Sequence, residues 1–341
     1  MTTTAAPAPV PLRLPEIHLR YPHRHHPDRD GAEQHTRQWL AQWNLFTETA
    51  QRDNASHVFG HLGAYAYPLA DQELLHLAAD WMTWLYAFDD GDIDECEPSP
   101  TSVTTQIARL LGALEGGSAQ TPLAGALADI CARVARLGSA SQAARFRDKV
   151  RGYLMGCLAE ITYRAAGRSP RVEEYLPLRV QASGDLTCLV LAELASGSPE
   201  LSAAQLHHPD VEALTLHAAY IIAMANDVFS LPREIANSPV DFIFNLPLVC
   251  SRAHTGNSAL QAGLDQAAQL TNDRIRTFAE LHEQAEPAAD AATRAHLKSI
   301  RAWLQGTYDW MIDCGRYHPH WRQEDWPART APPFPAECSS L

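Results

Sequence analysis

The chain has 341 residues, of which 46% are hydrophobic and 20% charged, a composition typical of a globular protein. Its formal net charge of −13 argues against a nucleic-acid partner, because phosphate backbones bind basic surfaces. The seven cysteines include no closely spaced pair, so we expect reduced thiols rather than a zinc or redox site. The chain opens without a signal-peptide pattern and has no apolar run long enough to cross a bilayer, so we expect a cytoplasmic protein without a membrane partner.

In chain order, the pattern predicts an arm, a helical body and a tail. Residues 1–30 are rich in Pro, His and Arg without periodicity and predict an extended N-terminal arm. Apolar residues at helical spacing recur through 31–317, which predicts one all-α domain, a single helical bundle. The expected helices cover roughly 32–53, 71–90, 102–116, 121–137, 140–167, 172–197, 209–231, 240–253, 257–285 and 289–314. Residues 318–341 carry five prolines and predict a non-helical C-terminal tail.

A first cluster of oxygen ligands follows the helix predicted over 71–90. Five carboxylates occur within seven residues, namely Asp89, Asp90, Asp92, Asp94 and Glu95. On a helix Asp89 shares a face with apolar residues one and two turns earlier, so it should lie at the rim of a buried surface. A solvated acidic helix end is the simpler alternative. A calcium loop is excluded, because Glu95 and Thr101 stand where glycine and glutamate are required.

A second cluster lies near the end of the helix predicted over 209–231. Asn226, Ser230 and Glu234 recur every four residues and would form one row on a helix. An amide oxygen, a hydroxyl and a carboxylate suit a hard cation that retains some waters, so the row predicts magnesium rather than zinc. The alternative is a helix terminus with incidental polar residues. Pro232 interrupts the row and should kink the helix or end its regular part.

The two clusters together resemble the metal motifs of bacterial class I terpene cyclases. An aspartate-rich motif ends an aromatic helix, and Asn226-Asp-Val-Phe-Ser-Leu-Pro-Arg-Glu234 follows some 130 residues later. The resemblance implies the helical-bundle fold of that family, with its cavity opening at the metal-motif end. It also implies three bound Mg²⁺ ions. Carried over, the metal ligands would be Asp89, Asp90, Asp94, Asn226, Ser230 and Glu234. Asp92 is the alternative to Asp94 as the last ligand of the first motif, because the sequence fits both spacings.

Other segments extend the resemblance over nearly the whole chain. The resemblance implies that Arg233 lies beside the diphosphate and that Arg316, in the family's terminal arginine–tyrosine pair, hydrogen-bonds it in the closed state. Tyr317 completes that pair, whose closure would exclude water. Gly184 matches the glycine that breaks a helix and turns its carbonyl toward the departing cation. Val180 occupies the position where the family carries a diphosphate-sensing arginine, so Arg179 is the candidate for that role. The alternatives are that the sensor is missing and that Arg179 forms a surface salt bridge.

The implied reaction is the magnesium-dependent ionisation of a linear isoprenyl diphosphate, followed by cyclisation and release of diphosphate. The enzyme would be a carbon–oxygen lyase. Farnesyl diphosphate, which would give a sesquiterpene, is the first expectation for the substrate, and geranylgeranyl diphosphate, which would give a diterpene, is the alternative. The carbocation needs an apolar, aromatic pocket. Candidates for its lining are Trp81, Leu85, Tyr86, Phe88, Ile222, Phe229 and Trp310, some of which must be ordinary core residues.

Alternative functions fit less well. A chain-elongating prenyltransferase should carry a second aspartate-rich motif where this chain has the Asn226–Glu234 row. A non-catalytic helical ligand-binding protein would leave both motifs unexplained. Monomer and homodimer both remain open.

Overall fold

The computed structural model describes residues 12–46, 58–94, 99–197, 199–237, 243–256 and 258–327. These residues form helices joined by short loops, without a β-strand among them. In chain order the α-helices are α1 (Arg29–Trp43), α3 (Phe59–Ala66), α4 (Gln72–Phe88), α5 (Pro100–Leu114), α6 (Pro122–Leu137), α7 (Ala140–Ala165), α8 (Val172–Ala182), α9 (Asp185–Leu194), α10 (Ala203–Leu206), α11 (Pro209–Asn237), α12 (Leu246–Ser251), α13 (Ala259–Ala285) and α14 (Ala291–Asp313). A π-helical turn, η2 (Asp89–Asp94), continues α4, and three 3₁₀ turns follow later, η4 (Glu286–Ala288), η5 (His318–His320) and η6 (Gln323–Asp325).

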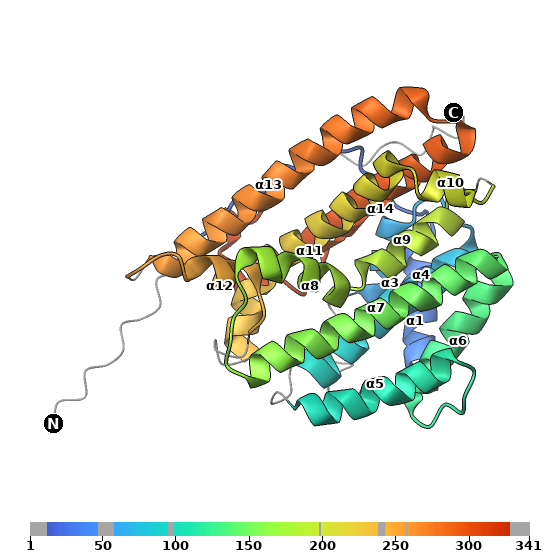
Figure 1. Ribbon diagram of the computed structural model, residues 1–341, viewed down its shortest axis with the longest axis horizontal. Coiled ribbons are helices and arrows are strands. Elements are labelled where there is room, and N and C mark those ends of the chain that lie inside the picture. Colours follow the sequence, from blue (N-terminus) through green and yellow to red (C-terminus); the bar gives the residue numbers. More distant parts are fainter. Residues whose placement is uncertain are drawn as a thin grey trace.

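The bundle is organised around α11. Figure 1 shows α13 along one edge of the molecule, α5 along the opposite edge, and α11 and α14 running between α13 and α7. Helix α11 packs against α8, α9, α12, α13 and α14. It is apolar and long enough to cross a membrane by length and composition, but 72% of its apolar window is buried inside the molecule. It is therefore the central core helix, and the predicted all-α bundle is confirmed.

Side chains at the helix starts explain several boundaries. Asp71 accepts a hydrogen bond from the backbone N–H of Leu74 at the start of α4, and Thr121 caps α6 in the same way. Ser139 and Gln142 form a reciprocal capping box at the start of α7. Such caps satisfy backbone N–H groups that have no partner within the helix.

Several predicted helices differ from the structure. The helix expected over 32–53 ends as α1 at Trp43, because Asn44 adopts a left-handed φ of +51°. The helix expected over 172–197 is divided into α8 and α9 at Gly184, whose φ of +75° is in the left-handed region that favours glycine. Helix α11 runs past Pro232 to Asn237, so the proline does not end it. Residues 240–242 of the helix expected over 240–253 lie outside the described residues, and α12 itself begins only at Leu246.

The described part of the arm is extended, whereas the tail that was predicted to be non-helical contains two 3₁₀ turns, η5 and η6, within residues 318–327. Residues 12–28 contain no helix and run beside α13 and α14. The backbone N–H of His18 donates to Asn272 Oδ1 at 2.8 Å, and that of Tyr21 donates to Gln305 Oε1 at 2.6 Å. At the other end, the indole N–H of Trp321 donates to the carbonyl of Phe229 in α11 at 2.9 Å. The domain limits at residues 30 and 317 stay predictions.

One helix crossing yields a stability prediction. Gly306 in α14 lies so close to the backbone carbonyl of Tyr65 that an added Cβ would overlap it. We expect Gly306→Ala to lower the free energy of unfolding by about 1–3 kcal/mol, because the packed crossing must open. Gly112 in α5 has open space around it, so Gly112→Ala should instead stabilise the protein by about 0.5–1 kcal/mol. Chemical denaturation of both variants measures the difference, and equal effects would contradict the prediction.

Candidate active site

Most of the predicted polar residues line one small cavity, together with Glu160 and Phe244, which the sequence did not single out. Its volume is about 30 Å³, which is enough for about two water-sized groups. The residues that line it are Tyr86, Asp89, Glu160, Arg179, Asn226, Ser230, Arg233, Glu234, Phe244, Arg316 and Tyr317. Residues from α4, α7, α8 and the segment after α14 thus surround the predicted Asn226/Ser230/Glu234 row on α11.

The row on α11 has the predicted spacing, and its oxygens are held by protein donors. Ser230 Oγ donates to Glu234 Oε1 at 2.5 Å, and Asn245 Nδ2 donates to Glu234 Oε2 at 3.0 Å. Asn226 Oδ1 accepts from Arg179 Nη2 at 2.9 Å, while its Nδ2 donates to Tyr317 Oη at 2.9 Å. The three side chains therefore face one space, as a shared cation would require.

Asp89 and Asp90, the first two residues of the aspartate-rich motif, have different surroundings. Asp89, half-buried at the end of α4 where the π-helical turn begins, lines the cavity. Asp90 is buried and accepts two hydrogen bonds from Arg316, with Nη1 at 2.9 Å and Nη2 at 2.6 Å. Arg233 Nη2 lies 3.5 Å from Asp90 Oδ1. In this structure Asp90 thus compensates two arginine charges. Its predicted role as a metal ligand stays a prediction.

The choice between Asp92 and Asp94 is left open. The side chains of both residues lie outside the part of the chain that the structure describes. Among the described residues, no three His, Cys, Asp or Glu side chains are grouped so as to hold a metal ion. The oxygen donors that do face the cavity include an amide and a hydroxyl, a set that suits Mg²⁺.

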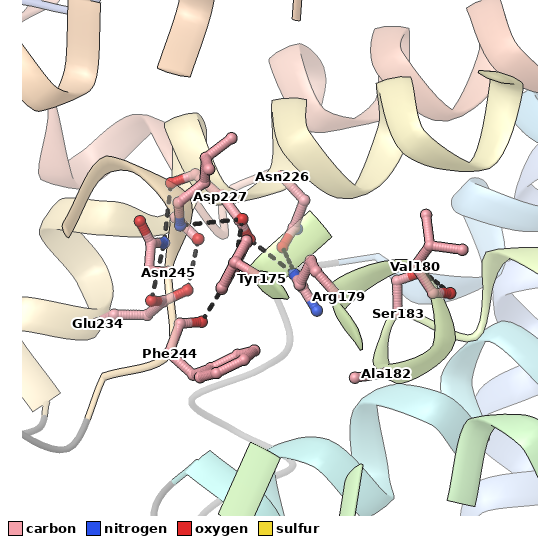
Figure 2. A network of polar contacts seen from close by, with 12 residues as sticks. Tyr175, Arg179, Val180, Ala182, Ser183, Asn226, Asp227, Glu234, Phe244 and Asn245 are labelled. Atoms are coloured by element: carbon pink, nitrogen blue, oxygen red, sulfur yellow. Dashed lines mark hydrogen bonds and ion pairs between the residues drawn. The ribbon is translucent and has the colours of Figure 1, made fainter. Parts of the chain in front are cut away.

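Arg179 reaches the cavity, whereas Val180 does not. Arg179 Nε donates to Asp227 Oδ1 at 2.8 Å, and Figure 2 shows its guanidinium directed toward Asn226 and Asp227. Val180 lies on the far side of Arg179 from Asp227 in the same view and is buried. The arginine is therefore a half-buried ion-pair partner of the buried Asp227, not a surface salt-bridge residue. Its contact with diphosphate remains a prediction.

The anchor of Arg179 was not singled out from the sequence. Asp227 is buried and accepts from Tyr175 Oη at 2.6 Å and from the backbone N–H of Leu246 at 3.1 Å. Burial raises the pKa of the Asp227 carboxyl, while the guanidinium of Arg179 acts in the opposite direction. Its position inside the Asn226–Glu234 row was the available signal. Glu160, on the buried face of α7, was also missed; a carboxylate among apolar helix positions was the clue.

Gly184 performs its predicted helix break, but its carbonyl is used within the protein. The oxygen accepts from the hydroxyl of Thr187 and from that residue's backbone N–H, the latter at 3.0 Å. A Cβ on Gly184 would lie 2.8 Å from Leu85 Cδ2, so the glycine packs directly on α4. The carbonyl therefore serves as part of the start of α9 here, and its role toward a carbocation is not tested by this arrangement.

The seven predicted pocket residues occupy different environments. Tyr86 lines the polar cavity, and its ring stacks on Phe59 and contacts Trp310. Arg316 Cζ lies 4.6 Å above the Tyr86 ring, a cation–π contact. Trp310 also meets Tyr317 edge-on. These rings form an aromatic group beside the arginines.

The other predicted pocket residues are more deeply placed. Trp81 and Phe88 are fully buried and pack with Trp84 in a stack on α4. Phe229 contacts Tyr308, Tyr317 and Trp326, so it supports the C-terminal segment. Ile222 is buried, and Leu85 is half-buried against Gly184. Lining of a substrate pocket by these residues stays a prediction.

Comparisons with known proteins agree with this geometry. Residues 80–306 match the family model described as "Terpene synthase family 2, C-terminal metal binding". The chain is 30% identical over 310 residues to a (+)-T-muurolol synthase of Roseiflexus castenholzii, covering 88% of this chain and 92% of that protein. It is 27% identical over 327 residues to a 4-epi-cubebol synthase of Streptosporangium roseum, with 94% and 97% covered.

The fold also matches a solved enzyme. The 2-methylisoborneol synthase of Streptomyces coelicolor A3(2), solved with Mg²⁺ and 2-fluoroneryl diphosphate, superimposes with a TM-score of 0.81 over 89% of this chain and 98% of that one, at 21% identity. The family model spans both predicted metal motifs and most of the bundle. This chain therefore belongs to the terpene synthase family and is a terpene cyclase of class I.

Proposed function

We propose that the enzyme converts farnesyl diphosphate to a cyclic sesquiterpene, with Mg²⁺ at the Asp89 and Asn226/Ser230/Glu234 sites. The observation that carries the proposal is the meeting of both motifs and three arginines on one cavity. Support for the substrate comes from the two relatives above, both of which are named as farnesyl diphosphate cyclising. Three ions, as in the family that the sequence resembles, are part of the proposal.

Each element of the site has a role in departure of the diphosphate. When bound, the Mg²⁺ ions supply Lewis-acid stabilisation of the leaving group's charge. Arg179, Arg233 and Arg316 line the same cavity and can donate to the diphosphate oxygens, which concentrates positive charge where negative charge develops. The Tyr86 ring lies against Phe59 and under Arg316, so it could face a carbocation only after Arg316 moves; such a face attracts a desolvated cation with up to about 2 kcal/mol.

Binding requires the present partners to exchange. Asn226 Oδ1 now accepts from Arg179, and Asp90 now holds Arg316. We propose that Arg179 and Arg316 would redirect their N–H groups from Asn226 and Asp90 to the diphosphate oxygens. Asn226, Ser230 and Glu234 would then be available to hold Mg²⁺. The planar guanidinium holds Nε and Nη2 in a fixed fork, so the Nε contact with Asp227 can orient Arg179 while the Nη2 contact with Asn226 is exchanged.

The test is incubation with farnesyl, geranylgeranyl and geranyl diphosphates, with and without Mg²⁺. We expect farnesyl diphosphate to release diphosphate and give a cyclic hydrocarbon or alcohol when Mg²⁺ is present, and neither product when Mg²⁺ is left out. Gas chromatography with mass spectrometry identifies the product. Release from geranylgeranyl diphosphate instead would change the substrate assignment to that diphosphate and the product to a diterpene. Absence of release from all three substrates would refute the proposal. Cytoplasmic location and the monomeric or dimeric state stay predictions.

A further inference from the structure

Asn245 contacts the metal row from outside the two motifs. It precedes α12, is fully buried, and donates through Nδ2 both to Glu234 Oε2 and to the backbone carbonyl of Asp227, each at 3.0 Å. Figure 2 shows its side chain between Glu234 and the Asp227 turn of α11. Both partners can only accept hydrogen bonds, so the amide nitrogen, and not its oxygen, must face them.

The other end of the same amide is unsatisfied. Asn245 Oδ1 is buried and has no hydrogen-bond donor among the described residues. A buried carbonyl without a partner is unfavourable, so an apolar residue here would avoid that cost. The asparagine side chain is therefore explained by what its nitrogen does for Glu234 and for α11.

Pro232 makes that contact more important. A proline has no N–H, so the helical hydrogen bond to the carbonyl of Val228 cannot form in the middle of the metal row. Helix α11 nevertheless continues to Asn237. Asp227, the residue before Val228, has two hydrogen bonds from outside the helix. Its backbone carbonyl accepts one from Asn245 Nδ2, and its carboxylate accepts one from the backbone N–H of Leu246. The segment at 245–246 thus braces the turn that the proline weakens, between Asn226 and Glu234.

Glu234 is consequently held at both oxygens. Ser230 donates to Oε1 and Asn245 to Oε2. When a cation takes the Oε1 side together with the Ser230 oxygen, the Asn245 contact can persist and fix the carboxylate's orientation. Partners of this kind, hydrogen-bonded to a metal ligand, commonly change metal affinity by 10- to 100-fold when they are removed.

We propose that Asn245 is a positioning residue that orients the Glu234 carboxylate for Mg²⁺ and braces α11 across Pro232. This inference rests on the proposed magnesium-dependent function. The residue touches neither the reacting atoms nor, in this arrangement, the cavity wall. Its effect passes through Glu234 and the helix that carries the whole Asn226/Ser230/Glu234 row.

The test replaces Asn245 with leucine, which has the same number of side-chain heavy atoms in the same branched arrangement but no donor. Isothermal titration of MgCl₂ in the presence of inorganic diphosphate measures binding without turnover. We expect about 10- to 100-fold weaker Mg²⁺ binding in Asn245→Leu. In turnover assays the Mg²⁺ concentration for half-maximal rate should rise, and excess Mg²⁺ should restore kcat toward the wild-type value. Asn272→Leu is the matched control, because Asn272 is also buried but holds the N-terminal arm; its Mg²⁺ affinity should be unchanged.

A second variant keeps the inference testable if Asn245→Leu does not fold. Asn245→Asp preserves the shape but replaces the donor by an acceptor, so it should also weaken Mg²⁺ binding. Wild-type Mg²⁺ affinity in either folded variant would overturn the positioning role. A wild-type enzyme that neither binds Mg²⁺ with diphosphate nor turns over a prenyl diphosphate would instead overturn the proposed function, so the two failures are distinguishable.

Discussion

Asn226→Ala and Glu234→Ala are each expected to reduce kcat/KM by at least about 10²- to 10³-fold, the range for removing one electrostatic contact from a water-excluded site. Both residues face the cavity and supply oxygens at opposite ends of the row on α11. Without either oxygen the row loses a ligand, and the charge on the departing diphosphate is less well stabilised. Steady-state kinetics with farnesyl diphosphate over a range of Mg²⁺ concentrations measures the loss.

The fold should survive these two changes. Asn226 and Glu234 are half-buried at the cavity, not packed in the core, so cooperative thermal unfolding should be retained. Asn237→Ala is a suitable control, because Asn237 is exposed at the end of the same helix and should leave both kinetics and stability near wild type. Full activity in Asn226→Ala or Glu234→Ala would refute the assigned row.

Arg316→Ala is expected to lower the free energy of unfolding by about 3–5 kcal/mol, because it leaves the buried Asp90 carboxylate without its principal partner. The two side chains are only 4% and 6% exposed and form a bidentate pair. Arg233, at 3.5 Å from Asp90, compensates only part of the charge. Turnover should also be lost, because one of the cavity's three arginines is removed.

A double-mutant cycle separates charge from packing. Asp90→Leu combined with Arg316→Met removes both charges, so the double variant should lose less stability than the sum of the single variants. The exposed pair Arg276–Asp273 is the control, and Arg276→Ala should change stability by about 0–1 kcal/mol. Chemical denaturation measures all variants. A loss in Arg316→Ala no larger than in Arg276→Ala would show that the buried pair does not contribute as argued.

Local patterns were sufficient for the all-α fold and for much of the site. Apolar periodicity predicted α7 over 140–167 and α13 over 257–285, close to the observed Ala140–Ala165 and Ala259–Ala285. The four-residue spacing of Asn226, Ser230 and Glu234 predicted a single row, because a helix returns to the same face after about one turn. Asp89 lies at the rim of a buried surface for the same reason.

Other features depend on residues far apart in the chain. The pairing of Asp90 with Arg316 joins positions 226 residues apart, and no spacing rule brings these together. The sequence places Arg179 one residue before Val180, the position expected to carry the arginine, and does not show where its side chain points. The fold of α8 directs that side chain at Asp227 and Asn226. Pro232 was expected to kink its helix or end its regular part. Helix α11 continues to Asn237, and Asn245 donates to the Asp227 carbonyl beside the turn that the proline interrupts.

The sequence alone thus determined the kind of protein: a helical bundle with two hard-oxygen metal motifs, since helical period and ligand type are local properties of the chain. Only the tertiary structure decided how the motifs are held. It placed Asp90 against Arg316, Arg179 against Asp227, and Asn245 against Glu234. Those contacts cross between η2, α8, α11, the segment before α12 and the segment after α14, so they arise only when burial of the apolar helix faces brings these segments together.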